Sequence, residues 1–153
     1  MDVRFTPWEI FRYYAKLRGR EDPDLTANEI ISYLNLERCA DTIIGDNIKV
    51  RGISGGEKKR VNVGIELVSN PRLLFLDEPT TGLDSATAFE VINHIRNLKN
   101  NGMTVITTIH SPSAEILEMF DNLIILCDGY LVFEGKPKYI AQRIWNLNFN
   151  TDP

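Results

Sequence analysis

The sequence predicts an α/β fold, and three observations carry this prediction. Residues 73–76 form a short apolar run bounded by turn residues, which is typical of a strand buried on both faces in a parallel sheet. Residues 103–109 are also apolar and rich in β-formers, and a helical pattern separates them from the first strand. Strand, helix and strand in this order predict two parallel strands joined by a right-handed crossover. Asp128-Gly129 lies between two further apolar segments and predicts a β-hairpin.

The first 70 residues carry three patterns of Ser or Thr followed three positions later by Glu, which indicate helix starts. At the first of them, Pro7 occupies the first helical position, which suits proline. In the third helix, Gly64 lies on the apolar stripe, so we expect close packing there. The patterns at Thr6, Thr26 and Ser54 predict helices over about residues 6–18, 26–36 and 54–69.

A fourth helix is expected between the two strands, with Asp84 or Ser85 as its cap and Asn101-Gly102 at its end. Its apolar stripe consists of Ala88, Val91, Ile92, Ile95 and Leu98. Shorter helices are expected over residues 111–120 and 137–145. We therefore expect a helical subdomain over residues 1–70, a core part over residues 71–145 and a polar tail over residues 146–153.

The composition limits the class of protein. The chain has 153 residues, of which 43% are hydrophobic and 25% charged, as in an ordinary globular domain. A net charge of -4 argues against nucleic acid as a partner, because phosphates attract basic surfaces. Cys39 and Cys127 stand far apart, so we expect neither a disulfide framework nor a zinc site. No apolar run approaches the roughly 20 residues of a membrane span, and the first residues contain no signal-peptide core.

Two carboxylates, Asp77 and Glu78, follow the first predicted strand, and Pro79 and Gly82 prevent a regular continuation. In open α/β sheets, ligands bind where strands end and loops begin. An acid in this place suits Mg²⁺, bound directly or through water, so Asp77 is the candidate metal ligand. Glu78 is the candidate general base for a water that attacks a phosphate. The alternative is that both are loop carboxylates without a ligand.

Ser54-Gly55-Gly56-Glu57 has two interpretations. As a capping box it needs no ligand. The two glycines, however, free the first helical turn of side chains, so that backbone N–H groups could approach a phosphate closely. Cations near a helix N-terminus oppose the helix dipole, and a bound anion would offset that cost. The run Lys58, Lys59 and Arg60 also fits a solvated basic face.

His110 stands at the end of the second predicted strand. Because parallel strands end at the same edge of a sheet, we expect His110 within reach of a phosphate bound beside Asp77 and Glu78. The alternative for a histidine after a buried strand is a structural role. His94 lies in the middle of the fourth helix, off its apolar stripe, and is expected to be solvated.

Four segments of the chain, in this order, resemble the nucleotide-binding domains of ABC transporters. Residues 53–57, Ile-Ser-Gly-Gly-Glu, resemble the signature motif, and residues 73–78 resemble the Walker B motif with its catalytic Glu. Gly82-Leu83-Asp84 looks like the D-loop, and His110 looks like the switch histidine. Residues 50–60 and 77–85 look most like the G subfamily, which comprises half-transporters of lipids, sterols, pigment precursors and xenobiotics. The resemblance extends from Thr6 to about Ile140.

The resemblance implies a partial P-loop NTPase fold, namely an ABC ATPase domain with a helical signature subdomain, a parallel β-α-β core and a C-terminal β-hairpin. It implies ATP and Mg²⁺ as ligands, with Asp77 positioning the metal, Glu78 as general base and His110 contacting the γ-phosphate. Asp84 would signal across a dimer. The residues that would bind the ATP of the other subunit are Ser54, Gly55, Gly56 and Glu57. The implied partners are a second nucleotide-binding domain and a transmembrane domain, at the cytosolic face of a membrane.

The chain departs from the family pattern in what it lacks. It contains no G-x-x-x-x-G-K-[ST], so the Walker A motif is missing, as are the Q-loop glutamine and the membrane domain. These departures predict the C-terminal portion of a nucleotide-binding domain, which we expect to be inactive by itself. Two alternatives stay open. The chain could be a non-catalytic module that lends a signature face to a partner's ATP, or an ABC ATPase of translation or DNA repair.

Overall fold

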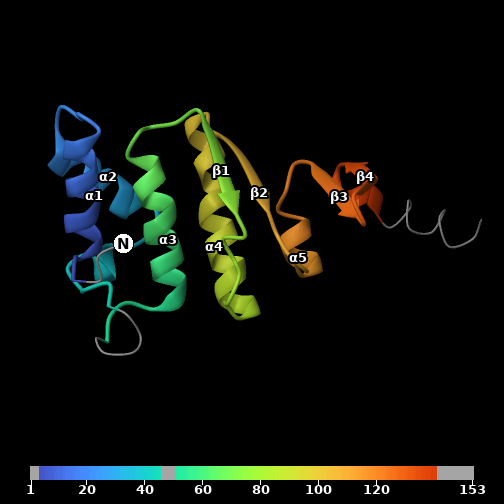
Figure 1. Ribbon diagram of the computed structural model, residues 1–153, viewed down its shortest axis with the longest axis horizontal. Helices are drawn as coiled ribbons and strands as arrows, with labels where there is room; N and C mark the ends of the chain where they lie inside the picture. The colour runs from blue at the N-terminus through green and yellow to red at the C-terminus, as the bar shows by residue number, and fades with distance from the viewer. Residues whose placement is uncertain (1–3, 46–50, 141–153) are drawn as a thin grey trace, which may run out of the picture. The chain divides into compact units, whose positions relative to one another are not determined.

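The computed structural model describes residues 4–45 and 51–140. These residues form helices α1 to α5 and strands β1 to β4 (Figure 1). The chain divides into two compact units, Met1–His110 and Ser111–Pro153. The domain boundaries expected at residues 70 and 145 stay predictions, and the expected tail, residues 146–153, lies outside the described residues.

Helix α1, Pro7–Leu17, begins at the predicted capping box. The Thr6 hydroxyl accepts a hydrogen bond from the Glu9 N–H at 3.2 Å, and the Glu9 carboxylate accepts one from the Thr6 N–H at 3.0 Å. These bonds satisfy N–H groups that have no partner inside the helix. The first predicted helix start is therefore confirmed.

Helix α2, Pro23–Tyr33, begins before Thr26, so the second predicted start is wrong. Asp22 caps the helix instead, and one of its carboxylate oxygens accepts hydrogen bonds from two N–H groups of the first turn, at 3.1 and 2.9 Å. Pro23 suits the first helical position, and the carboxylate is favourable at the positive end of the helix dipole. Thr26 lies inside the first turn, where its hydroxyl donates to the Asp22 carbonyl at 2.8 Å. The helix also ends before residue 36, because Asn35 has a φ of 51°.

Helix α3, Gly55–Leu67, begins after Ser54 as predicted and packs against α1 and α2 (Figure 1). A Cβ placed on Gly64 would lie 2.5 Å from the buried ring of Phe11 and 2.9 Å from Ile30. A side chain has no room at these distances, so the close packing expected at Gly64 is confirmed. The core shared by the three helices includes Ile10, Phe11, Ala15, Ala27, Ile30, Leu34 and Val61.

Replacing Gly64 by Ala is expected to lower the free energy of unfolding by about 1–2 kcal/mol, because overpacking outweighs the gain in helix propensity. Urea denaturation followed by circular dichroism measures the change. Asn62→Ala, at an exposed position of the same helix, is the matched control and should not destabilise the protein. A Gly64→Ala protein as stable as the Asn62→Ala protein would contradict the close contact.

Strands β1, Leu73–Asp77, and β2, Thr104–Thr108, pair in parallel as predicted, and their last residues lie opposite each other. The burial predicted for the first strand is wrong. Leu74 is buried, whereas Phe75 and Ile106 are 67% and 51% exposed on the other face. A parallel sheet needs a packed layer on each face, and the described residues cover only one.

Helix α4, Ser85–Asn97, connects the two strands and confirms the predicted β-α-β unit. Its cap is Asp84, one of the two residues expected there. The helix continues as a 3₁₀ turn, Leu98–Asn101, and ends at Gly102, whose φ of 76° suits glycine. The five residues of the predicted apolar stripe are all buried.

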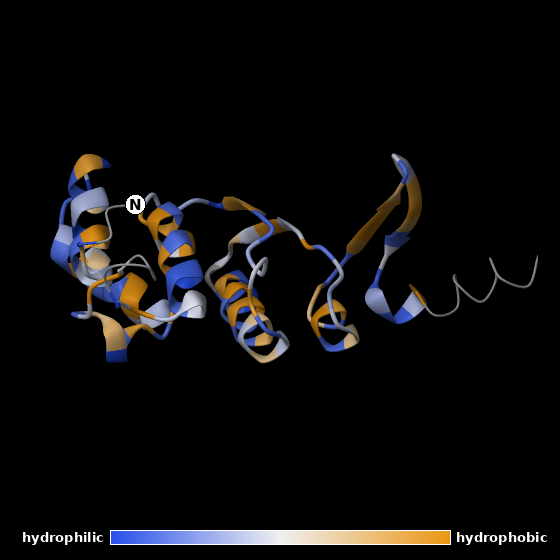
Figure 2. Cartoon of the chain, turned by 60° about the horizontal axis from the view of Figure 1, so that its bottom comes forward, coloured by the Kyte–Doolittle hydropathy of each residue, from blue (hydrophilic) through white to orange (hydrophobic). Residues whose placement is uncertain are grey.

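The second unit contains the predicted hairpin, with β3, Leu123–Cys127, antiparallel to β4, Tyr130–Gly135. Asp128 and Gly129 have φ angles of 50° and 81°, as a two-residue type I′ turn requires. Figure 2 shows hydrophobic colour along much of both strands. The hairpin is therefore confirmed.

The first helix of the second unit is shorter than predicted. Helix α5, Ala114–Leu117, is capped by Ser113, whose hydroxyl accepts a hydrogen bond from the Ile116 N–H at 3.4 Å. Ser111 does not start a helix, because its φ is 47°. The helix expected over residues 137–145 begins as a 3₁₀ turn, Pro137–Tyr139, and residues from 141 onward lie outside the described range. Within the described residues, no helix has the length and apolar character needed to cross a membrane.

Candidate functional site

The candidate site lies at the edge of the sheet where β1 and β2 end. Asp77 is the last residue of β1, Glu78 follows it, and His110 comes two residues after the end of β2. Because the strands are parallel, these residues follow strand ends at one edge, and all three are exposed. The structure therefore places the predicted acids and the histidine at the same edge, while their chemical roles stay predictions.

Thr108, the last residue of β2, contacts both acids but is not among the residues that the sequence predicts for the site. Its hydroxyl donates a hydrogen bond to the Asp77 carboxylate at 2.5 Å and accepts one from the Glu78 N–H at 3.0 Å. Strand alternation offers a partial signal, because every second residue of β2 lies on the face of Asp77. The register that places Thr108 opposite Asp77 depends on strand pairing, which this alternation alone leaves open.

Glu78 has a left-handed backbone conformation, with a φ of 45°. A positive φ is costly for a residue with a Cβ and is concentrated at functional sites. The Glu78 carboxylate accepts a hydrogen bond from the Thr81 hydroxyl at 2.6 Å, and the Thr81 N–H donates to the Glu78 carbonyl at 3.2 Å. Thr81 therefore holds the acid over the loop that follows β1.

Asp77 fits the metal role predicted for it. One of its carboxylate oxygens accepts the Thr108 hydrogen bond, and the exposed carboxylate has further lone pairs. Across residues 4–45 and 51–140, no three His, Cys or acidic side chains gather into a closed metal site. Mg²⁺ does not require one, because one or two carboxylates, water and substrate phosphates commonly bind it. The donor at Asp77 is therefore compatible with Mg²⁺ that arrives with a nucleotide.

Ser54 caps α3 through the predicted capping box. The Glu57 N–H donates to the Ser54 hydroxyl at 3.3 Å, and the Glu57 carboxylate accepts from the Ser54 N–H at 2.7 Å. Burial raises the pKa of the Glu57 carboxyl, but the hydrogen bonds from Ser54 and Cys39 together with the Arg60 charge outweigh it, so the pKa is lowered overall. A hydroxyl has two lone pairs, and the N–H of Glu57 occupies one of those of Ser54. Ser54 and Gly55 are exposed, so the capping box and an anion at this helix start are compatible.

Gly56 has a packing role that the sequence does not reveal. A Cβ on Gly56 would clash with a methyl group of Thr87 in α4, and one on Gly55 would lie 3.4 Å from Leu83. Thr87 also donates its hydroxyl to the carboxylate of Asp84, the cap of α4, at 2.6 Å. Hydrogen bonds from Thr87 lower the pKa of that carboxyl. The segments predicted as signature motif and D-loop therefore touch each other within one chain.

Arg60 does not belong to a solvated basic face, because its side chain is buried. Its guanidinium lies 4.0 Å from the Glu90 carboxylate of α4, and Nε has no hydrogen-bond partner within the described part of the chain.

His94 is half-buried rather than solvated. Burial is the main cause that lowers the pKa of His94, and the positive charge of Arg60 is the second. Burial, with the Glu57 carboxylate as a second cause, raises the pKa of Cys39 to about 11. Both cysteines are free thiols.

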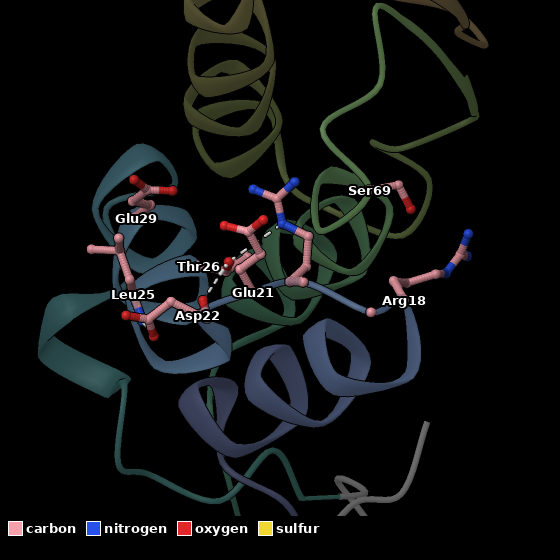
Figure 3. Close-up of a pocket in the computed structure, with 9 residues that line it drawn as sticks. Arg18, Glu21, Asp22, Leu25, Thr26, Glu29 and Ser69 are labelled. Atoms are coloured by element: carbon pink, nitrogen blue, oxygen red, sulfur yellow. Dashed lines mark hydrogen bonds between the residues drawn. The ribbon is translucent and has the colours of Figure 1, made fainter.

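A hollow of about 660 Å³ opens between the connection of α1 and α2 and Ser69 beyond α3 (Figure 3). Figure 3 shows Asp22 and Glu29 on one side of it and Arg18 and Ser69 on the other. None of the predicted site residues lines this hollow. Its three acids, which include Glu21, outnumber its two arginines, so it does not suit a polyanion such as a nucleotide.

The sequence is similar to known transport proteins. The model of the ABC transporter family matches residues 4–81. The chain is 45% identical over 147 residues to ABC transporter G family member 1 of Dictyostelium discoideum, a match that covers 92% of this chain and 18% of that protein. It is 49% identical over 143 residues to ABC transporter G family member 22 of Arabidopsis thaliana, with coverage of 88% and 19%.

A third relative is the broad substrate specificity ATP-binding cassette transporter ABCG2 of Mus musculus, 43% identical over 126 residues. This match covers 82% of the chain and 19% of the mouse protein. The chain therefore spans about a fifth of the length of the curated relatives it matches. The similarity to the G subfamily that the motifs predict is confirmed.

The fold is that of an ATP-binding cassette. The crystal structure of the ADP conformation of an ATP-binding cassette of an ABC transporter superposes with a TM-score of 0.72 at 22% identity. The superposition covers 97% of this chain and 64% of that one. A second structure of the same cassette gives a TM-score of 0.71. With this fold confirmed and the family match over residues 4–81, the chain belongs to the ABC transporter family.

Proposed function

We propose that the chain is the signature, Walker B and switch-histidine part of an ATP-binding domain that couples ATP hydrolysis to transport across a membrane. The observation that supports this most strongly is the sheet edge, where Asp77 ends β1, Glu78 follows it and the parallel strand β2 leads to His110. Phosphoryl transfer depends mainly on positioning and on charge stabilisation. A metal ligand, a base and a hydrogen-bond donor to the phosphate lie at this one edge. Together they contribute to the positioning of the reactants and to charge stabilisation.

Each residue at the edge has one role in this proposal. Asp77 holds Mg²⁺, and the metal, when bound with ATP, neutralises charge on the phosphates. Glu78 orients the attacking water and accepts its proton. His110 donates to the γ-phosphate. The exposure of all three leaves room for the nucleotide that they must contact.

The start of α3 binds the ATP of a partner domain. Backbone N–H groups at a helix N-terminus, together with the helix dipole, favour an anion, and Gly55 is exposed there. Ser54 presents an exposed hydroxyl, and Glu57 fixes the backbone of Ser54 through the capping box. Asp84 carries the signal across the dimer from the neighbouring start of α4. The start of α3 contacts the start of α4, at Thr87. This contact supports the proposal that ATP binding at the start of α3 and signalling by Asp84 are linked.

The proposed partners are a second nucleotide-binding domain and the transmembrane domain of a transporter, at the cytosolic face of a membrane. Similarity to G-family members supports the export of lipids, sterols or xenobiotics. A non-catalytic role is the second candidate, because the 153 residues contain no Walker A motif. In that case the chain lends its signature face to the ATP of a complete partner.

Ser54→Ala tests the proposed signature face. We expect the mutation to weaken ATP-dependent association of the chain with an intact G-family ATP-binding domain about tenfold or more, because a hydrogen bond to a charged phosphate contributes about 1.5–3 kcal/mol. Loss of the cap alone costs roughly 1 kcal/mol of stability. Analytical ultracentrifugation with and without Mg-ATP measures the association, and thermal unfolding measures the stability.

Thr6→Ala is the matched control, because Thr6 forms the same kind of capping box at the start of α1. It should lower stability about as much as Ser54→Ala and leave the association unchanged. Equal association of the Ser54→Ala and parent chains in saturating ATP would reduce Ser54 to a helix cap. Equal losses in both variants would trace the effect to stability.

A further inference from the structure

One hydroxyl group contacts both acids at the sheet edge. Thr108 Oγ1 lies 2.5 Å from an oxygen of Asp77 and 3.0 Å from the backbone nitrogen of Glu78. Thr108 is the last residue of β2 and Asp77 the last of β1, and the parallel register places them opposite each other. The contact is therefore made by strand pairing across 31 residues of sequence and not by a local turn.

The chemistry of a threonine hydroxyl suits both bonds at once. The group has one proton and two lone pairs. The proton is donated to the Asp77 carboxylate, which can only accept, and a lone pair accepts the Glu78 N–H. Linked hydrogen bonds of this kind polarise and strengthen each other, and the carboxylate makes one of them charge-assisted. The β-branch also restricts rotation about χ1 and so limits the directions of the hydroxyl.

The backbone that Thr108 contacts is strained. Glu78 has a φ of 45°, which is unfavourable for a residue with a Cβ. Such a conformation persists only where its surroundings hold it. The Thr81 hydroxyl holds the carboxylate end of Glu78, and the Thr108 hydroxyl holds its N–H from the neighbouring strand.

We propose that Thr108 is a positioning residue that sets the direction of the Asp77 carboxylate and the conformation of Glu78 together. The consequence for hydrolysis rests on the proposed roles of Asp77 and Glu78, whereas the positioning itself does not. Removal of the hydroxyl frees the Asp77 carboxylate and the Glu78 N–H without changing either acid. Thr81, in contrast, holds Glu78 alone.

The test compares the 153-residue chain with Thr108→Val, which keeps the shape and loses the hydroxyl, and with Thr108→Ser, which keeps the hydroxyl. Thr104→Val, on the same face at the other end of β2, is the matched control. Amide hydrogen exchange is read by mass spectrometry with residue-level fragmentation. Relative to the amides of β1, the Glu78 amide should exchange about tenfold faster in Thr108→Val. In Thr108→Ser and Thr104→Val it should exchange close to the parent rate.

A second measurement separates the positioning from the metal role. Fe²⁺, added with ascorbate and peroxide in place of Mg²⁺, cleaves a chain beside the site where it binds. We expect cleavage of the parent near Asp77 and weaker cleavage of Thr108→Val. No cleavage near Asp77 in the parent would count against the proposed metal ligand and leave the exchange result standing.

Two results would overturn the positioning role. One is a Glu78 amide that exchanges equally fast, relative to β1, in Thr108→Val and in the parent. The other is faster exchange along β1 and β2 without an excess at Glu78, because Thr108 would then support the fold and not the acids. A Thr108→Ser chain that matches Thr108→Val would also exclude the hydroxyl as the cause.

Discussion

Glu78→Gln is expected to slow ATP turnover by about 10²–10⁴-fold, with ATP binding preserved, in a domain completed by fusing the Walker A half of a G-family relative ahead of this chain. Glutamine keeps the length of the side chain and an oxygen that can accept the hydrogen bond from Thr81. It cannot take up a proton, so the variant removes the base and leaves the loop intact. Phosphate release at saturating Mg-ATP measures turnover, and equilibrium dialysis measures binding.

Glu66→Gln is the matched control for this variant, because Glu66 is an exposed acid on α3. The control should turn over at the parent rate. Turnover of the Glu78→Gln domain close to the parent rate would exclude Glu78 as the base. A loss of ATP binding in that variant would show that the carboxylate acts on the nucleotide or its metal and not on the water.

The elements that can be predicted from the sequence are those set by nearby residues. The capping boxes at Thr6 and Ser54 each depend on a partner three positions away, and both form. The Asp128-Gly129 turn depends on two residues that tolerate a positive φ. The stripe of α4 depends only on helical periodicity, and all of it is buried. In each case the local chemistry and the final fold agree.

Prediction from the sequence fails where two local signals compete. It also fails where the structure of a residue depends on packing against distant parts of the chain. Asp22 and Thr26 are both good helix caps, and Asp22 prevails because Pro23 fits the first helical position after it. The apolar character of Phe75 indicates a covered strand, but cover depends on what packs against the sheet, and Phe75 is exposed. Arg60 looks like a surface cation in sequence, whereas the packing of α3 buries it.

In the candidate site, too, some residues can be predicted from the local sequence, whereas others depend on tertiary contacts. Asp77, Glu78 and His110 can be found in the sequence because they follow apolar strands, and parallel pairing then places them at one edge. Thr108 cannot be found in this way, since its contact depends on the register between β1 and β2. The contact between Gly56 and α4 depends on the packing of two helices and is equally hidden.

The 153-residue chain by itself is expected to release no phosphate from Mg-ATP above background and to self-associate. The sequence lacks the glycine-rich cradle and lysine that position the phosphates, and Asp77 and Glu78 repel phosphate unless a cation bridges them. Phe75 and Ile106 form an open apolar face on the two-stranded sheet, and such a face invites association. A phosphate-release assay and sedimentation velocity over a range of concentrations measure the two properties.

Phe75→Thr together with Ile106→Thr should shift the chain towards monomer, because threonine keeps β-propensity and removes most of the apolar surface. Leu17→Gln is the matched control, since Leu17 is exposed on α1, a helix that packs against α2 and α3, so its replacement should leave association unchanged. A parent chain that sediments as a monomer would contradict the expectation that the exposed apolar face of the sheet causes self-association. Steady phosphate release by the parent, abolished by Glu78→Gln, would show that other residues supply the phosphate cradle, because a base alone cannot position the nucleotide.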